Sequence, residues 1–298
     1  MTTISSSRSC PVSVVIPTFN RSNILVNTLK QILKCDPLPD EIIVHIDGND
    51  IQSENIVRDN FKNVKIIKSD QNIGPGGGRN RLITIAKNEI VASFDDDSYP
   101  YDFDYFGRLI KIFNSYPEAS IIATAIYDQN RPIQEAIKKA SWTASFVGCG
   151  CAYKKSDFLK TDGYLKLPLA YGAEESDLAI QLYAKGRKIL QTEWLRVYHN
   201  TSYNHHKNTN INAASIANIA LLAFIRYPWF IWGKTLLQIG NRIIYAIRNK
   251  RYSGILLGLS YIPQQMWLYR NYRDPTSLSV IKQYFQLRKN PQPVTWQN

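Results

Sequence analysis

Residues 90–97 read Ile-Val-Ala-Ser-Phe-Asp-Asp-Asp, a short apolar run that ends in three carboxylates. Three similar runs precede it, at residues 12–16, 41–46 and 64–67, and residues 24–33 repeat apolar side chains at helical spacing. Strands that alternate with helices predict a parallel α/β sheet. The chain has 298 residues, of which 44% are apolar, so it is long enough to bury a full core.

Polar side chains follow these predicted strands at the points where the strands end. They are Thr18, Asn20, Asp47, Asn72 and the three aspartates Asp95, Asp96 and Asp97. In open parallel sheets, ligands bind beyond the carboxyl ends of the strands. The sequence therefore predicts that these side chains gather at one edge of the sheet and form a ligand site.

The three adjacent aspartates repel one another unless a cation lies among them. Hard oxygen ligands of this kind suit Mg²⁺ or Mn²⁺, which proteins often share with phosphate oxygens. The alternative is a solvated acidic turn that holds no metal. His199 follows a short predicted strand and is either a structural residue or a third ligand to the metal or a phosphate.

The glycine-rich stretch Gly74-Pro75-Gly76-Gly77-Gly78 opens a predicted helix that runs to about residue 87. Glycines at a helix start let backbone N–H groups approach a phosphate or a ribose, and the neighbouring Arg79 suits a diphosphate. The spacing excludes a dinucleotide-binding fingerprint, and no Gly-Lys-Ser/Thr follows, which excludes a P-loop.

Three acids, Glu174, Glu175 and Asp177, lie at the start of a predicted helix over residues 175–185. Acids in the first helical turn complement the helix dipole, which is the structural interpretation. The catalytic interpretation is a general base that removes a proton from an attacking hydroxyl group. The two interpretations stay open at this point.

Five segments together resemble family-2 glycosyltransferases, in the order that the family has them, across roughly residues 11–200. They are Val14 to Arg21, Asn72 to Asn80, Phe94 to Asp97, Tyr171 to Leu178, and Val197 to His199. The resemblance implies the GT-A fold, a Rossmann-like α/β domain with a mostly parallel sheet that binds a nucleotide sugar. It also implies a nucleoside-diphosphate sugar donor and a displacement that inverts the anomeric centre.

The resemblance also implies roles for individual residues. Asp95 and Asp97 take the places of the metal-binding pair, with His199 as a further ligand. Glu175 takes the place of the catalytic base, where the family more often has Asp, and Glu174 and Asp177 are the alternatives. The residues expected to bind the donor are Pro17, Thr18, Asn20, Arg21, Asp47, Asn72, Gly74, Arg79, Asn80, Asp95 and Asp96.

This sequence departs from the family at the end of the second strand. The family commonly has two acids before a glycine there, whereas Ile46 stands in the first of these positions, before Asp47 and Gly48. Asp47 alone is therefore expected to reach the nucleoside, and the choice between uridine and deoxythymidine stays open.

The net charge of +12 is concentrated in the last third of the chain. Residues 201–298 contain 12 Lys and Arg, a single acid (Asp274) and four of the six tryptophans. Cationic amphipathic helices with Trp and Tyr favour a membrane surface, and the alternatives are a solvated basic face or nucleic-acid binding. No apolar run reaches the roughly 18–20 residues that a transmembrane helix needs.

This composition predicts three parts: a flexible terminus over residues 1–10, a catalytic domain over 11–205 and a basic helical region over 206–298. We expect no nucleic-acid partner, and we expect a peripheral enzyme at the cytoplasmic face of the membrane, acting on a saccharide or lipid-linked acceptor. Surface or extracellular polysaccharide synthesis would use such an enzyme. The first residues lack the apolar segment of a signal peptide.

The cysteines fit neither a disulfide framework nor a C-x-x-C pair, which favours a reducing cytoplasm. Cys149 and Cys151 are interpreted as small buried residues of a strand predicted over residues 146–153, rather than as metal ligands. His205 and His206 are interpreted as loop residues.

Two other functions stay open. A degenerate GT-A domain would hold a nucleotide or saccharide without turnover, although Asp95, Asp97 and Glu175 argue against it. A nucleotidyltransferase that forms sugar nucleotides would have a Gly-rich loop bearing Arg or Lys after the first strand, where this chain has Pro17 to Asn20.

Overall fold

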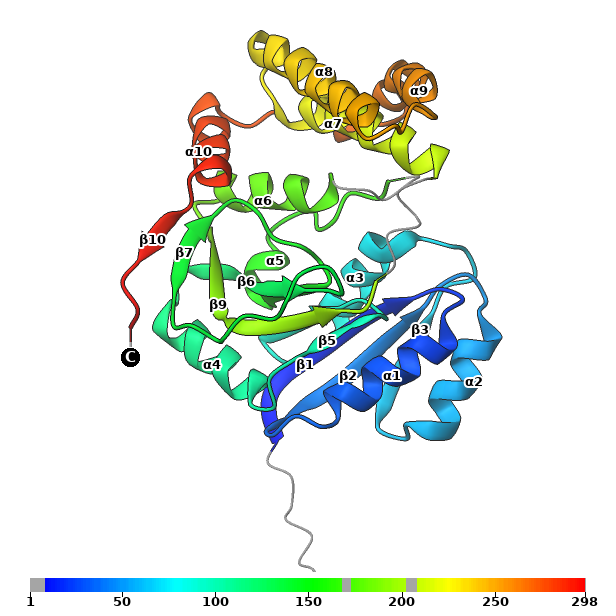
Figure 1. Ribbon diagram of the computed structural model, residues 1–298, viewed down its shortest axis with the longest axis vertical. Coiled ribbons are helices and arrows are strands. Elements are labelled where there is room, and N and C mark those ends of the chain that lie inside the picture. Colours follow the sequence, from blue (N-terminus) through cyan, green and yellow to red (C-terminus); the bar gives the residue numbers. More distant parts are fainter. Residues whose placement is uncertain (1–8, 168–172, 202–207, 298) are drawn as a thin grey trace, which may run out of the picture.

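The structure is a computed structural model that describes residues 9–167, 173–201 and 208–297 (Figure 1). A central sheet lies between helices on both faces, in the strand order β10-β7-β9-β6-β8-β4-β1-β2-β3, with β5 paired to β9 outside this row. The strands are β1 (Ser9–Thr18), β2 (Leu38–Ile46), β3 (Val64–Lys68), β4 (Ile90–Phe94), β5 (Ser98–Pro100), β6 (Ala119–Tyr127), β7 (Ala140–Thr143), β8 (Gly150–Lys154), β9 (Lys188–His199) and β10 (Gln292–Val294). The predicted α/β class is confirmed.

The helices connect these strands and continue beyond them. They are α1 (Ser22–Ile32), α2 (Ile51–Asn60), α3 (Gly74–Ile85), α4 (Tyr105–Ser115), α5 (Lys155–Phe158), α6 (Glu174–Ala184), α7 (Thr209–Arg226), α8 (Trp232–Arg248), α9 (Ile255–Leu268) and α10 (Leu278–Lys289), with 3₁₀ turns at Trp229–Ile231 and Arg270–Tyr272. Two predicted segments, residues 171–172 and the pair His205-His206, lie outside the described residues, as do residues 1–8 of the predicted terminus.

Strand β1 shows how the sheet separates two cores. Val14 and Ile16 pack on one face with Leu25 of α1, and Val15 between them packs on the other face with Leu82 of α3. Successive side chains of a strand point to opposite faces. A continuous apolar run is therefore buried on both sides, as expected for a strand inside a parallel sheet.

The parallel part of the sheet brings the predicted ligand residues together. Strands β3, β2, β1 and β4 all run parallel to their neighbours, whereas β8 runs antiparallel between β4 and β6. The carboxyl ends of β1, β2 and β4 consequently meet at one edge. Thr18 is the last residue of β1, and Asp47 and Asp95 directly follow β2 and β4.

Strand β9 carries a distant residue to the same edge. It pairs with the three-residue strand β5, with Tyr198 opposite Tyr99 and His199 opposite Ser98. Because β5 begins directly after Asp97, this antiparallel pairing places His199 beside the aspartates. The backbone N–H of Asn200 also donates to the carbonyl oxygen of Asp97 at 2.8 Å.

Helices α7, α8 and α9 form a layer on the far side of α6 from the sheet (Figure 1). Ile216 and Ala220 of α7 pack with Ile239 of α8 in a small separate core. Helix α9 approaches α7 closely at Gly258, where a Cβ atom would lie 2.7 Å from the carbonyl oxygen of Ala213. No helix in residues 9–167, 173–201 and 208–297 combines the length and apolar character needed to cross a bilayer.

The end of the chain returns to the sheet, which corrects the prediction of one helical region over 206–298. Tyr284 of α10 is buried in the same core cluster as Leu178 of α6, and β10 pairs with β7 at the sheet edge. Trp296 then packs edge-on against Trp194 and Tyr116. The apolar faces of α10 and β10 thus belong to the sheet domain, although their composition resembles that of the preceding helices.

Candidate active site

A pocket of about 270 Å³ lies at the carboxyl ends of β1, β2 and β4. It is lined by Pro17, Thr18, Phe19, Arg21, Asp47, Asn72, Gly74, Pro75, Asp95 and Asp96. Eight of these are residues that the sequence predicted to bind a nucleotide-sugar donor. The two others, Phe19 and Pro75, were not predicted, although both lie inside the segments that carry the family resemblance.

Three predicted donor residues, Asn20, Arg79 and Asn80, do not line the pocket. Both side-chain ends of Asn80 bond the backbone of Tyr164 at 2.8 Å, which fixes the loop after α5. Arg79 is buried, where it donates to the Ser93 hydroxyl at 2.9 Å and forms an ion pair with Asp95. Asn20 adopts a left-handed backbone with φ of 54°. Of the three, Arg79 supports the pocket wall through its ion pair with Asp95.

Asp47 lies on the pocket wall but uses its carboxylate within the protein. Its oxygens accept hydrogen bonds from the Ser69 hydroxyl at 2.6 Å and from the backbone N–H groups of Ile73 and Gly74 at 2.9 and 2.8 Å. A carboxylate at the start of a helix satisfies N–H groups that have no partner inside the helix. Asp47 therefore caps α3 and fixes the glycine-rich turn beside the pocket.

The three aspartates point in different directions. Asp96 accepts hydrogen bonds from the Thr18 hydroxyl at 2.8 Å and from Arg21 at 2.6 Å. The second arm of the Arg21 guanidinium lies 2.7 Å from Asp97. Burial raises the pKa of Asp96 to about 7. Burial also opposes the ionisation of Asp97, but its contacts with His199 and Arg21 lower the pKa of Asp97 to about 2.

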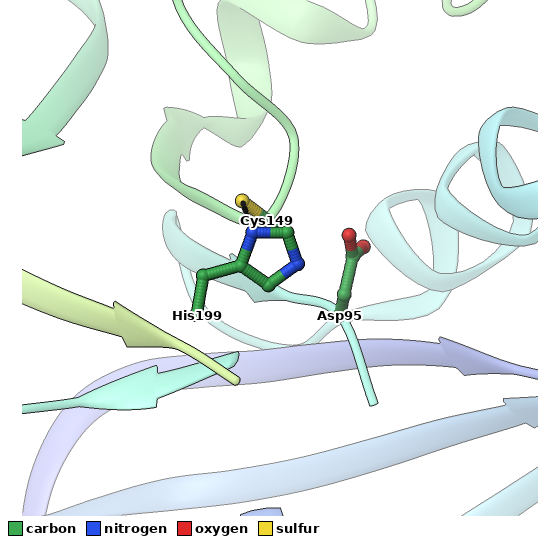
Figure 2. A group of neighbouring side chains, drawn as sticks. All are labelled: Asp95, Cys149 and His199. Atoms are coloured by element: carbon green, nitrogen blue, oxygen red, sulfur yellow. Dashed lines mark hydrogen bonds between the residues drawn. The ribbon is translucent and has the colours of Figure 1, made fainter. Parts of the chain in front are cut away.

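Asp95, Cys149 and His199 form a cluster in which one potential metal-ligand atom from each residue lies within 4.8 Å of the others (Figure 2). The Cys149 sulfur lies 3.8 Å from Nδ1 of His199. On the other side of the ring, Nε2 lies 3.0 Å from Oδ1 of Asp97. That carboxylate oxygen is buried and makes no aligned hydrogen bond within the described part of the chain.

This donor set fits a divalent cation. A buried carboxylate oxygen without an aligned donor is costly unless another positive group approaches it. Two carboxylates and an imidazole suit Mn²⁺ or Mg²⁺, and a thiol adds a softer ligand. Cys149 is buried as predicted, but it lies in the turn before β8 and faces His199, because the predicted strand over 146–153 begins only at Gly150.

Helix α6 presents the three predicted catalytic acids to different surroundings. Asp177 is buried and pairs with Nε of Arg226 at 2.6 Å, and it accepts a hydrogen bond from Gln181 at 2.6 Å. These contacts anchor α6 to α7. Glu174 is buried as well, and one of its oxygens lies 3.2 Å from the backbone N of Ala173.

Glu175 is only partly buried, and its Oε1 accepts a hydrogen bond from the backbone N–H of Gly148 at 3.3 Å. Burial and the neighbouring Glu174 raise the pKa of Glu175 to about 7. A carboxylate with a pKa near neutrality accepts a proton efficiently at that pH. Of the three acids, Glu175 therefore combines accessibility with the titration expected of a base.

Gly148, which sequence reasoning missed, links Glu175 to the cluster of Asp95, Cys149 and His199. Its carbonyl oxygen accepts from the Ser93 hydroxyl at 2.9 Å, and Ser93 in turn accepts from Arg79, the ion-pair partner of Asp95. A Cβ atom at Gly148 would lie 2.8 Å from Cζ of Arg79. Only glycine allows this approach, and no local sequence pattern marks it.

Comparison with known proteins finds related sequences and structures. Residues 13–158 match the model of glycosyl transferase family 2. Over 90 residues, 29% of this chain, the sequence is 36% identical to a GalNAc(5)-diNAcBac-PP-undecaprenol beta-1,3-glucosyltransferase of Campylobacter jejuni. That match spans 29% of the length of the relative.

Solved structures share the fold at low sequence identity. The mannosyltransferase PcManGT of Pyrobaculum calidifontis, in complex with GDP-Man and Mn²⁺, superposes with a TM-score of 0.56 at 17% identity, over 93% of this chain and 79% of that one. TarS of S. aureus in complex with UDP-GlcNAc gives 0.59 at 16% identity, over 94% and 91%. These likenesses establish the fold of the chain. Residues 13–158 match glycosyl transferase family 2, and the chain has the GT-A fold.

Proposed function

We propose that this protein transfers a sugar from a nucleoside-diphosphate sugar to a hydroxyl group of a saccharide or lipid-linked acceptor, with Mg²⁺ or Mn²⁺ and with inversion at the anomeric carbon. One observation carries the proposal. Glu175 is connected through Gly148, Ser93 and Arg79 to Asp95, which lines the pocket and belongs to the metal-ligand cluster. A chain of hydrogen bonds and one ion pair thus links the proposed base to the carboxylate that both lines the pocket and belongs to the proposed metal site.

The residues of the pocket account for donor binding. Phe19 is 42% exposed and lines the pocket, so its ring is free to stack on a nucleobase. Arg21 spans Asp96 and Asp97 and keeps their carboxylates in place. Asp95, Asp97 and His199 would hold the cation, which when bound neutralises charge on the departing diphosphate.

Glu175 supplies the remaining chemistry. Its carboxylate accepts the proton of the acceptor hydroxyl as that oxygen bonds to the anomeric carbon and the diphosphate departs. A single displacement of this kind needs one base and inverts the centre. The experiment that tests the function is detection of the released nucleoside diphosphate when the protein is incubated with candidate donors and Mn²⁺.

The rate of transfer is expected to rise with pH and to reach half its plateau near pH 7. Glu175 accepts a proton only as the carboxylate, and burial together with Glu174 raises its pKa to about 7. The rate at saturating donor, measured from pH 5.5 to about 8.5, checks this expectation.

The matched control for this profile is Glu174→Gln, which removes the neighbouring negative charge that helps to raise the pKa of Glu175. The midpoint is expected to move to lower pH in this variant. A midpoint that stays in place, or a rate that falls as the pH rises from 5.5, would contradict the role of Glu175.

We further propose that the protein works peripherally at the cytoplasmic face of a membrane, in the synthesis of a surface or extracellular polysaccharide. Helices α8 and α9 and the 3₁₀ turn before α8 expose large apolar side chains. Trp229 and Phe230 of the turn, Leu236 and Leu237 of α8, and Leu256 and Trp267 of α9 are each more than half exposed. Apolar and cationic side chains on one helical layer fit an anionic lipid surface.

Replacing two of these side chains, in Leu236→Ser/Leu237→Ser, is expected to reduce flotation of the protein with vesicles of phosphatidylglycerol and phosphatidylcholine. The two leucines are 71% and 70% exposed, so their loss removes apolar contact with lipid and little from the folded core. The matched control is Leu33→Ser/Leu159→Ser on the sheet domain, where the leucines are 43% and 50% exposed. Equal flotation of both variants and the unmodified protein would contradict membrane docking through α8.

One observation favours a second candidate function, a degenerate domain that binds a nucleotide without turnover. Arg21 and Arg79 already pair with all three aspartates. In such a domain these arginines would take the place of a metal. Nucleotide binding that is unchanged by EDTA, with no release of nucleoside diphosphate from any sugar donor, would favour it.

A further inference from the structure

A second cavity, of about 490 Å³, lies between α6, α7, α8 and α10. It shares no lining residue with the nucleotide pocket. Its volume falls within the range of roughly 300–1,000 Å³ that small-molecule sites occupy. Ser176 of α6 lines it, one residue after Glu175, so the helical turn that presents the proposed base also borders this cavity.

The lining of the cavity has a single sign of charge. Lys234 of α8 and Arg288 and Lys289 of α10 line it, and no Asp or Glu does. Within the described residues, none of these three cations forms a salt bridge. Asp274, the one acid after residue 200, is paired with Arg226 at 3.1 Å. The cavity therefore offers positive charge that the described protein does not neutralise.

Aromatic side chains hold two of these cations. The Lys234 ammonium lies 3.5 Å from the centre of the Phe285 ring. Arg288 donates to the Tyr284 hydroxyl at 2.7 Å and lies 3.4 Å from the hydroxyl of Ser176. Cations held in this way by rings and hydroxyls keep N–H groups available for an anionic ligand.

An apolar surface continues from the cavity along α8. Lys234 and Asn241 of α8 both line the cavity. Leu237 lies three residues after Lys234 and four before Asn241, so it neighbours both of them on the helix surface. Leu237 and Ile244 are 70% and 48% exposed. Phe285 and Leu222 add apolar side chains to the lining itself. Positive charge in a cavity beside an exposed apolar stripe matches a phosphate group attached to a lipid chain.

We infer that this cavity binds the phosphate or diphosphate group of a lipid-linked acceptor, with the lipid chain lying along the apolar stripe of α8. The inference rests on the proposed glycosyl transfer and names the chemical class of its acceptor. Lys234 and Arg288 contact phosphate oxygens from two sides. The saccharide on the diphosphate then extends past Ser176 towards Glu175.

Farnesyl diphosphate is a suitable probe, because it joins a diphosphate to a short isoprenoid chain. Binding is measured by calorimetry on the full chain in EDTA, which prevents metal-dependent binding in the nucleotide pocket. The Lys234→Gln/Arg288→Gln variant is expected to bind the probe about tenfold more weakly or worse, since it loses two charge-assisted contacts. The matched control, Arg248→Gln/Lys282→Gln, removes one exposed cation from each of the same two helices outside the cavity and should keep the wild-type Kd. Unchanged melting temperatures establish that both variants fold.

Other outcomes overturn the inference. Equal binding of the probe by both variants and the unmodified protein would show that the cavity is not its site. Inorganic pyrophosphate bound as tightly as farnesyl diphosphate would indicate a site for free phosphate. Binding of phosphatidylglycerol vesicles that depends on Lys234 and Arg288, without binding of the probe, would indicate a headgroup contact. Release of nucleoside diphosphate by the unmodified protein is measured separately, so that failure of the proposed function is distinguished from failure of this site.

Discussion

Glu175→Gln is expected to lower the rate of sugar transfer by about 100- to 10,000-fold, the contribution typical of a positioned general base. The amide cannot accept the proton of the acceptor hydroxyl, but it keeps the size of the side chain and an oxygen for the N–H of Gly148. The Kd for the nucleotide should therefore change little. Initial rates at saturating donor and acceptor, together with calorimetric titration of the nucleotide, measure the two quantities.

Glu174→Gln is the matched control for this prediction, because it changes the adjacent carboxylate in the same way. Glu174 is buried, and one of its carboxylate oxygens lies beside the backbone N of Ala173 at the start of α6. Its substitution is expected to shift the pH profile of the reaction but to leave the rate of sugar transfer at high pH unchanged. If Glu175→Gln retains the wild-type rate and Glu174→Gln loses it, the base is Glu174. Retention of the rate in both variants would contradict a base in the first turn of α6.

Asp97→Asn is expected to lower metal-dependent turnover by about 100- to 1,000-fold, the loss typical when a group that stabilises transition-state charge is removed. Oδ1 of Asp97 is buried and lies 3.0 Å from Nε2 of His199, and these two atoms would be ligands of the cation. The variant should also lose the rise in melting temperature that Mn²⁺ produces. Turnover and the thermal shift with Mn²⁺ are both measured.

Asp157→Asn serves as the matched control, since Asp157 is also buried and ion-paired, with Lys160 and Arg187 at 3.2 and 3.1 Å. It lines neither the nucleotide pocket nor the metal cluster. Its substitution should cost stability without changing the response to Mn²⁺. An Asp97→Asn variant that keeps both turnover and the Mn²⁺ shift would contradict a metal site at Asp97.

The parallel half of the fold was predictable because its signals are local. Each of β1, β2, β3 and β4 is a short apolar run, and Gly74 and Gly186 mark a helix start and a helix end. Strands β5 and β7 have three and four residues, and β10 has three. Such short strands form by pairing with distant partners, so composition and periodicity do not reveal them.

The contrast between local signals and contacts between distant segments also explains which parts of the site were predictable. Asp95, Asp96 and Asp97 stand together in the sequence, whereas Cys149 and His199 reach them only through the turn before β8 and the pairing of β5 with β9. Asp177 resembles a catalytic candidate in the sequence, and its partner Arg226 lies 49 residues away. Sequence reasoning located the acids but not their contacts, which make Asp47 a helix cap and Asp177 an anchor of α6 and leave Glu175 as the proposed base.

Asp47 and Asn80 show the opposite case, in which the sequence predicts a ligand-binding residue and the structure shows a structural one. Both stand where a ligand-binding residue is expected, after a strand or a glycine-rich turn. In the structure, Asp47 caps α3 and Asn80 fixes the loop at Tyr164. Polar side chains at strand ends satisfy the backbone of neighbouring turns as readily as they bind ligands, so their type and position alone do not separate the two roles.

The most direct test of the central claim is a thermal-shift measurement of the full chain with UDP, GDP or dTDP compounds, with and without Mn²⁺. A ligand that binds only the folded state stabilises it by RT ln(1 + [L]/Kd), or about 2.7 kcal/mol when its concentration is 100 times Kd. We expect at least one nucleotide to raise the melting temperature, and we expect this rise to require Mn²⁺ and to be lost in Asp97→Asn. No shift with any of these nucleotides at millimolar concentration, with or without the metal, would contradict the claim.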